Sequence, residues 1–229
     1  MKYLTINKAE VNLPESWAEV TWGQSCEIIT LFEDKEIPEQ RFILRIVSIL
    51  TGLAPKFWED YTDLPQFMAI ANSCAWAFRS DLQEEQLQNL RDKAWRVFTY
   101  EGERYELPYD IGSLTAAQFI DANAVQSRIA GMMEAEEIAK NKGEKYEFDI
   151  NSILDSKRQL FSIYFQALKD GEYNYQNADE LDVTGVPYIT VVKWADFFLA
   201  KMISLQSGTS QGQKLSLTLK TRLLQALKI

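Results

Sequence analysis

The sequence predicts an α+β fold that is mostly helical: two diverged repeats, each a β-hairpin followed by several helices, plus a C-terminal tail. Two short stretches, residues 3–13 and 97–108, alternate apolar and polar residues on either side of a turn signal, which is typical of hairpins. Longer stretches after each of them repeat apolar residues at three- and four-residue spacing, which is typical of helices. The same order of elements occurs twice, so we predict an internal duplication.

The first hairpin is predicted over residues 3–13, with the sequence YLTINKAEVNL. Its β-branched and aromatic residues alternate with polar ones around Asn7 and Lys8, which form the turn signal. Pro14 ends the second strand, because proline cannot donate a hydrogen bond to a neighbouring strand.

The first helix is predicted from about residue 22 to residue 32. Thr21 precedes it and Gln24 follows three positions later, so the threonine hydroxyl can cap a helix N–H while the glutamine side chain reaches back. Apolar periodicity predicts further helices over residues 38–51, 64–79 and 82–96. Gly52 ends the first of these, and Asp63 caps the next.

The second half repeats this order of elements. A hairpin is predicted over residues 97–108 around Glu101 and Gly102, and Thr115 and Gln118 occupy the same capping positions as before. Further helices are predicted over residues 151–169 and 187–206, with a loop between them. Residues 206–213 have the composition of a linker.

Identical residues support the duplication. A shift of 94 positions lays Thr5 on Thr99, Leu13 on Leu107, Pro14 on Pro108, Thr21 on Thr115 and Gln24 on Gln118. A shift of 118 positions lays Leu50 on Leu168 and Trp76-Ala77 on Trp194-Ala195. The difference implies an insertion of 24 residues in the second copy near residues 126–150; chance recurrence is the alternative. The predicted parts are residues 1–96, residues 97–206 and the linker with the basic tail, 207–229.

Composition excludes several classes of function. The chain has 33 Asp and Glu against 24 Lys and Arg, a formal charge of -9, which disfavours binding to nucleic acid or to an anionic membrane. No stretch approaches the roughly 20 apolar residues of a membrane span, and no signal peptide is recognisable. Cys26 and Cys74 lie in apolar helical patterns, so we expect small buried side chains rather than a disulfide or a reactive thiol.

The sequence contains no recognisable motif for catalysis or for cofactor or metal binding. There is no histidine, which removes the usual general base and the commonest metal ligand. Residues 207–214 resemble a phosphate-binding loop only faintly, because the glycine and lysine spacing is wrong, and a linker is the better interpretation. The acidic runs at 134–137 and 179–182 are interpreted as solvated surface. We therefore predict no catalytic, cofactor-binding or metal-binding residues.

Two features suggest partner binding. Most of the six tryptophans have the spacing of core residues, but Trp58 lies outside a clear apolar stripe and is a candidate interface anchor. The tail, KLSLTLKTRLLQALKI, has basic and leucine residues and no acidic ones, and its pattern fits a strand in one part and a helix in the other. The tail residues predicted to bind a partner are Lys214, Lys220, Arg222, Leu223 and Leu227. The tail can dock onto its own domain, a neighbouring copy or a different protein.

Several short sequence segments resemble those of a known group of proteins. The stretches INKAEVNLPESWAEVTWGQSCEIITLFED and ILRIVSILTGL resemble small proteins encoded in the structural gene clusters of tailed bacteriophages, especially those that infect gut Bacteroidetes. The shared pattern falls on Ile6, Leu13, Pro14, Ser16, Trp17, Glu19, Val20, Thr21, Leu50, Thr51 and Gly52. Residues 114–121 and 194–198 also fit it.

This resemblance implies a non-enzymatic morphogenesis protein that acts by protein–protein binding. Its most concrete form is a tail assembly chaperone, which escorts the aggregation-prone tape-measure protein until tail tube subunits surround it. The alternative is a virion structural component, such as a connector or ring subunit at the portal or tail. The implied partners are tape-measure, tail or connector subunits, with a homo-oligomer also considered. A chaperone would act in the host cytoplasm and a structural subunit in the virion. An apolar groove between the two repeats is the expected binding site.

Overall fold

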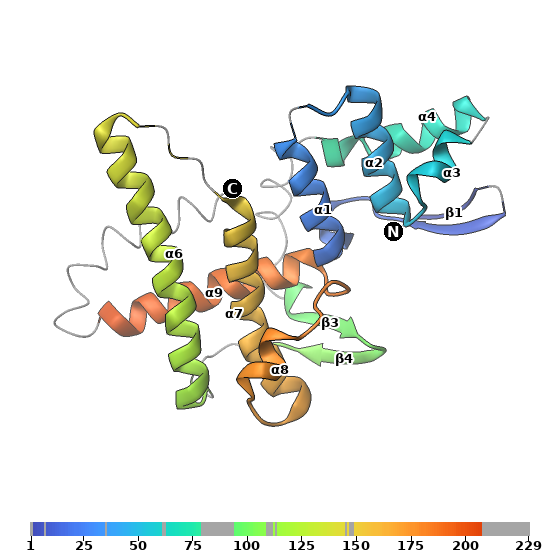
Figure 1. Cartoon of the computed structure of the whole chain (residues 1–229). Coiled ribbons are helices and arrows are strands. Elements are labelled where there is room, and N and C mark those ends of the chain that lie inside the picture. The colour runs from blue at the N-terminus through green and yellow to red at the C-terminus, as the bar shows by residue number, and fades with distance from the viewer. Residues whose placement is uncertain are drawn as a thin grey trace. The chain divides into compact units, whose positions relative to one another are not determined.

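The computed structural model describes residues 2–6, 8–34, 36–60, 63–78, 94–108, 112, 114–144, 146 and 149–207, without the side chains of residues 94 and 202–207. The chain divides into two compact units. The first unit is Met1–Gly102 with Thr184–Ile189, and the second unit is Glu103–Val183 with Thr190–Ile229. In the described residues helices dominate and the strands form two small hairpins, so the predicted α+β, mostly helical class is confirmed, while the two repeats stay a prediction (Figure 1).

The first hairpin has the predicted position. Strands β1 (Lys2–Ile6) and β2 (Ala9–Leu13) pair antiparallel, with Lys2 opposite Leu13. At the turn, Lys8 has a left-handed backbone with φ 71°. Ile6, Val11 and Leu13 are buried, so the hairpin presents one apolar face to the core of the first unit.

The helices of the first unit are α1 (Trp22–Glu33), α2 (Glu39–Thr51), α3 (Pro55–Glu59) and α4 (Leu64–Ser73), with 3-10 turns η1 (Trp17–Glu19), η2 (Ala75–Phe78) and η3 (Ala94–Arg96). Two of these helices, α1 and α4, begin at the capping residues predicted from the sequence. Thr21 and Gln24 form the predicted capping box, Gly52 ends α2 with φ 69°, and the side chain of Asp63 accepts a bond from Gln66 N. The short helix α3 was not predicted.

The prediction of one helix over residues 64–79 is wrong in its last part. The helix α4 stops at Ser73, where the N–H of Cys74 bonds to the carbonyls of both Ile70 and Ala71 and tightens the chain into η2. That turn brings the ring of Trp76 edge-on to Trp17, with centroids 5.7 Å apart. The predicted helix over 82–96 lies outside the described residues, except for its last three residues, which form η3.

A returning segment, residues 184–189, completes the first unit. The N–H groups of Trp22 and Gly23, at the start of α1, donate to the carbonyls of Val186 and Thr184 at 2.7 Å and 3.0 Å. Helix N-termini leave such donors without partners inside the helix, so this segment satisfies them. The ring of Tyr188 stacks on Trp22 with centroids 5.7 Å apart. The first turn of α1 is thus fixed by residues more than 150 positions away in sequence.

The second hairpin pairs β3 (Val97–Tyr100) with β4 (Glu103–Glu106), as predicted. At its turn Glu101 and Gly102 have φ values of 50° and 84°. Two consecutive residues with positive φ are what a tight two-residue hairpin turn requires, and glycine adopts that conformation at little cost.

The helices of the second unit are α6 (Ala116–Lys142), α7 (Ile150–Asp170), α8 (Tyr175–Asp179) and α9 (Tyr188–Ser207). The first two residues of α9 belong to the first unit. Helix α6 packs beside α7 (Figure 1). The region predicted as an insertion, 126–150, is largely a continuation of α6. The predicted loop before α9 contains the short helix α8, which Asn174 caps, so that prediction is wrong over residues 175–179.

A buried layer of α7 forms the core of the second unit. Residues 160–166 are all buried, so α7 is covered on every side there. The ring of Tyr164 lies 4.5 Å from that of Trp194 in α9. The ammonium of Lys157 lies 3.3 Å from the carboxylate of Asp196, whose pKa is raised by burial against the opposing effect of Lys157. These contacts join α7 to α9 within the unit.

The two units use one hydrogen-bonding arrangement in the same way. In the first unit Gln24 Nε2 donates to Ile49 O of α2 at 3.0 Å, and in the second unit Gln118 Nε2 donates to Ile163 O of α7 at 3.0 Å. Each glutamine also completes the capping box of its own helix. One glutamine therefore caps its helix and attaches it to the next helix in both units.

This arrangement changes the predicted alignment of the repeats. The pairing of Leu50 with Leu168 joins residues of unlike burial, because Leu50 is 1% exposed and Leu168 is 39% exposed. Matching the two carbonyl acceptors instead pairs Ile49 with Ile163, and each of these follows a buried serine. The duplication itself stays a prediction, with this pairing as its improved form.

Candidate functional site

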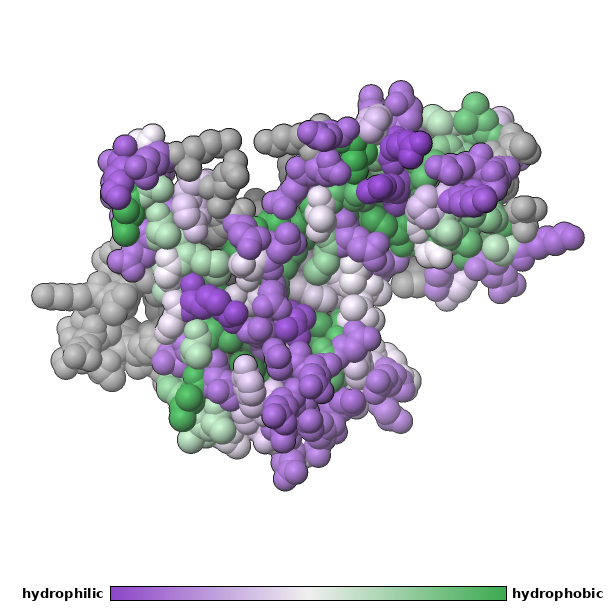
Figure 2. Space-filling model, viewed as in Figure 1, coloured by the Kyte–Doolittle hydropathy of each residue, from purple (hydrophilic) through white to green (hydrophobic). Residues whose placement is uncertain are grey.

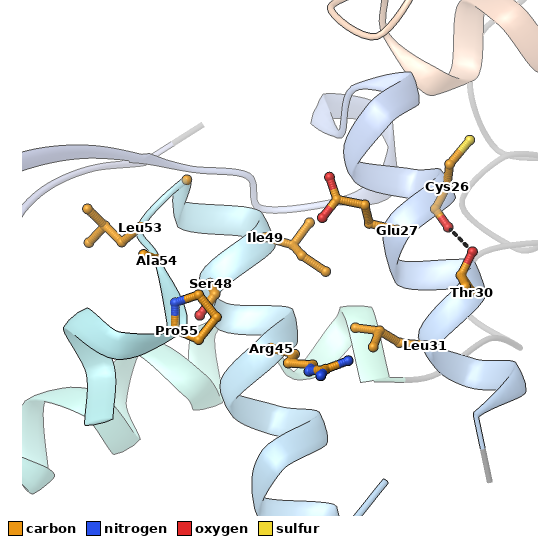
Figure 3. A pocket seen from close by; sticks show the side chains of 11 residues that line it. Cys26, Glu27, Thr30, Leu31, Arg45, Ser48, Ile49, Leu53, Ala54 and Pro55 are labelled. Atoms are coloured by element: carbon orange, nitrogen blue, oxygen red, sulfur yellow. Dashed lines mark hydrogen bonds between the residues drawn. The ribbon is translucent and has the colours of Figure 1, made fainter. Parts of the chain in front are cut away.

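An open, mostly apolar groove of about 610 Å³ lies between α1 and α2 in the first unit (Figure 3). We call it the α1–α2 groove. Its lining residues are Cys26, Glu27, Thr30 and Leu31 of α1, Arg45, Ser48 and Ile49 of α2, and residues 52–55 after α2. Figure 3 shows Glu27 and Leu31 extending from α1 toward Ile49 and Arg45 of α2.

Two attachments between α1 and α2 lie at the two ends of the groove. At one end the side chain of Gln24 bonds to the carbonyl of Ile49. At the other end the rings of Phe32 and Phe42 meet edge-on with centroids 5.3 Å apart. Between these two attachments lies the space lined by Leu31 and Ile49, with Glu27 and Arg45 on its walls.

The chemistry of the lining suits apolar side chains. The hydroxyl of Thr30 donates to Cys26 O at 2.9 Å, and that of Ser48 donates to Leu44 O at 2.8 Å. Both donors are therefore used within their own helices. Burial raises the pKa of the Cys26 thiol to about 11, so at neutral pH it is a protonated thiol and a poor nucleophile. The surface of the groove is therefore mostly apolar, with one acidic side chain, Glu27, and one basic side chain, Arg45, at its walls.

Figure 2 shows where hydrophobic side chains reach the surface on one face of the molecule. In the first unit, green residues come to the surface among purple hydrophilic ones over its helices. On α4, Leu64 is 63% exposed and Met68, one turn later, is 48% exposed. Exposed apolar residues that neighbour one another are a feature of binding surfaces.

A second hollow, of about 300 Å³, lies among α6, α7 and α8 in the second unit. Several polar groups in or beside it are bonded to other protein groups. A guanidinium nitrogen of Arg128 donates to Gln159, and the Tyr173 hydroxyl donates to Asp121 at 2.7 Å. Burial, and then the bond to Asp121, raise the pKa of the Tyr173 hydroxyl, so it remains protonated.

The structure places one of the six residues predicted to bind a partner. Trp58 lies in α3 and is 4% exposed, with its ring edge-on to Phe57 at 5.1 Å and tilted against Phe67 at 5.5 Å. It packs inside the first unit, and its role as an anchor stays a prediction. The other predicted residues are Lys214, Lys220, Arg222, Leu223 and Leu227, and they lie outside the described residues.

Other sequence interpretations are confirmed by burial. The tryptophans interpreted as core residues are buried at positions 17, 22, 95 and 194, and Trp76 is half-buried. Cys74 is buried and Cys26 is half-buried, and both are free thiols. In the two acidic runs, most carboxylates are exposed, as expected for solvated surface.

The groove residues were not predicted from the sequence. Leu31, Ile49 and Leu53 belong to ordinary apolar helical patterns or follow one, and nothing in their spacing distinguishes a groove wall from a core contact. The available signal was Gln24, because a capping glutamine can also attach its helix to a second one.

Two properties concern the described part of the chain alone. No three side chains of the metal-binding types lie together there in a way that could hold a metal ion. No helix in those ranges combines the length and the apolar character needed to cross a membrane.

Comparison with known proteins gives no identification. No protein-family model matches the sequence, and no curated protein or solved structure has significant similarity to it.

Proposed function

We propose that this chain is a bacteriophage morphogenesis protein that acts by binding other proteins, most concretely as a tail assembly chaperone. The observation that supports it best is the α1–α2 groove, an open apolar surface whose hydroxyl donors are already bonded within the helices. The resemblance of the N-terminal phrases to proteins of phage structural gene clusters supplies the biological setting. The activity proposed is non-enzymatic.

The groove suits a short apolar segment of an extended or helical client. Such segments bind by placing regularly spaced side chains into a groove. Full burial of one leucine or isoleucine contributes about 1.5–3 kcal/mol, so two or three of them, minus the cost of association, give modest and reversible affinity. Reversibility is what a chaperone needs, because its client must pass on to the tail tube.

Co-expression tests this function. The chain should raise the soluble yield of a tape-measure protein from the same phage genome, compared with co-expression of an unrelated acidic protein of similar size. Retention of the tape-measure protein on the tagged chain should accompany the rise. Equal soluble yields with the two partners would argue strongly against a chaperone.

The second candidate is a structural subunit of the virion, such as a connector or ring subunit at the portal or tail. The exposed pair Leu64 and Met68 on α4 favours it, because such a pair can pack against a neighbouring subunit. Mass spectrometry of purified particles separates the two candidates. A chaperone of the host cytoplasm is absent from particles, whereas a structural subunit is present in stoichiometric amount.

The binding groove expected between the two repeats also stays a prediction. The groove described above lies within the first unit.

A further inference from the structure

We propose that the outward face of helix α6 is a dimer interface, on which the same helix of a second copy of this chain packs antiparallel. The interface lies in the second unit alone, whereas the α1–α2 groove is complete within the first unit of one chain. The dimer therefore does not rest on the proposed function.

The outward face of α6 has an unusual composition for an exposed helix surface. The opposite side of the helix is buried at Ala122, Val125 and Ile129. The outward face is defined by six exposed positions that lie alternately four and three residues apart: Ile120, Ala124, Ser127, Gly131, Glu134 and Ile138. Exposed helix faces normally carry charged and polar residues, but here one residue of the six is charged.

This face is open among the described residues. Ile120 is 65% exposed and Ile138 is 48% exposed. A methyl group added at Gly131, between them, would meet nothing within 4 Å. In Figure 2, hydrophobic side chains reach the surface near both ends of α6. Exposed apolar residues that share one face are a feature of binding surfaces.

The spacing of the outward face fits a second helix that lies alongside α6. Positions alternately four and three residues apart form the contact seam of paired helices. The small residues Ala124, Ser127 and Gly131 lie between the two isoleucines, and small side chains at a contact allow helix axes to approach closely. Arg128, at the edge of this face, donates to Gln159 of α7, so its guanidinium is directed away from the seam.

Charge favours a second copy of this chain as the partner. Two chains of formal charge -9 repel one another over most of their surface, so they approach with least repulsion through a face that is nearly uncharged. The six positions are also symmetric about residue 129. An antiparallel pair therefore places Ile120 of each copy opposite Ile138 of the other, and Ser127 opposite Gly131. A two-fold dimer requires such self-complementarity, because both copies use the same surface.

The single charge on the face also decides the direction of the pair. In the antiparallel arrangement, Glu134 of each copy lies opposite Ala124 of the other, which is uncharged. In a parallel arrangement the two Glu134 carboxylates would lie at the same height along the seam and would repel one another. The antiparallel pair avoids this repulsion.

The size of the face predicts a weak dimer. The seam from Ile120 to Ile138 is about 27 Å long and a helix is about 10 Å wide, so the buried surface is smaller than the roughly 800 Å² per partner of a standard interface. We therefore expect a dissociation constant in the micromolar range, with monomer and dimer in exchange.

Sedimentation equilibrium of the full-length chain, from low micromolar to several hundred micromolar concentration, tests the dimer. Ile120→Asp and Ile138→Asp should each weaken dimerisation at least ten-fold, because each buries a carboxylate in the seam. Tyr3→Asp is the control, since Tyr3 is 80% exposed and lies in β1 of the first unit. It should leave the dissociation constant within two-fold, and far-UV circular dichroism checks that each variant is folded.

Cross-linking tests the direction. In a Cys26→Ser background, with Cys74 kept because it is buried, one chain carries Ile120→Cys and a second, size-tagged chain carries Ile138→Cys. The antiparallel pair brings these two positions together, whereas the two copies of position 120 lie about 27 Å apart. With a short bis-maleimide, the mixture should therefore give at least five-fold more dimer than either variant alone.

Three results would each overturn the proposal. They are a chain that stays monomeric at the highest concentration, a dimer that both aspartate variants leave unchanged, and single cysteine variants that cross-link as well as the mixture. The proposed function is tested by a different result. Because each chain keeps its own groove, a monomeric Ile120→Asp variant should bind a client segment as the unmodified chain does.

Discussion

The replacement of Gly23 by alanine tests the contact that fixes the start of α1. In a helix, glycine to alanine is worth about 0.5–1 kcal/mol in favour of alanine. At Gly23 the added methyl group would lie 3.2 Å from Thr184 Cβ and 3.4 Å from Thr184 O, which is tight. Overpacking typically costs about 1–3 kcal/mol, so we expect a net loss of about 1 kcal/mol in the free energy of unfolding.

Gly131 in α6 is the matched control, because a methyl group there meets nothing within 4 Å. Gly131→Ala should therefore stabilise the chain by about 0.5–1 kcal/mol. Urea unfolding followed by circular dichroism and tryptophan fluorescence gives both values. Thr184→Gly combined with Gly23→Ala should recover most of the loss as a coupling between the two sites. If Gly23→Ala stabilises as much as Gly131→Ala, the described packing of residues 184–189 on α1 is wrong.

Three further predictions concern hydrogen bonds and ionisation. Gln118→Ala should lower the free energy of unfolding by about 2 kcal/mol and Gln24→Ala by about 1 kcal/mol. The difference is expected because Gln118 is 3% exposed whereas Gln24 is half-buried. Equal losses in urea unfolding would contradict this. Burial raises the thiol pKa of Cys26 to about 11 and that of Cys74 to about 12, so maleimide at pH 8 should modify Cys26 roughly 100-fold more slowly than a free thiol, and Cys74 more slowly still. Peptide mapping gives the order, which a faster Cys74 would refute. Hydrogen bonds from Ser152 lower the pKa of the Asp149 carboxylate, which caps the start of α7. Its contribution to the stability of α7 is therefore complete above the ordinary aspartate pKa and is lost as the pH falls through the lowered pKa of the folded chain. In the Asp149→Asn variant, the rate of amide hydrogen exchange at the start of α7 should change less between neutral and acid pH than in the unmodified chain. The same pH dependence in both proteins would contradict this role of Asp149.

Local signals explain which parts of the fold the sequence predicts. The capping boxes of α1 and α6 depend on residues three positions apart, so the chemistry is complete within one turn. The turn of the second hairpin is likewise decided by Glu101 and Gly102 alone. Gly52 ends α2 through its own left-handed conformation. Each of these features is predictable because its cause lies within a few residues.

Other features depend on distant residues or are too short for a periodic signal. The five residues of α3 cannot complete two turns, so no spacing pattern identifies them. Helix α4 ends at Ser73 although its apolar pattern continues, because Trp76 turns to meet Trp17. The α1–α2 groove depends on two attachments between helices, one of them from Gln24. None of these contacts can be read from a local pattern.

The account of function depends on the α1–α2 groove as a surface that binds apolar polypeptide segments. Binding of the tape-measure protein to purified chain, measured by titration calorimetry, tests this most directly when Ile49→Asp is compared with Ile120→Asp. Ile49 lines the groove, whereas Ile120 is 65% exposed on α6. We predict that Ile49→Asp weakens binding at least ten-fold while Ile120→Asp leaves it within two-fold of the unmodified chain. Equal affinities for the two folded variants would contradict the account.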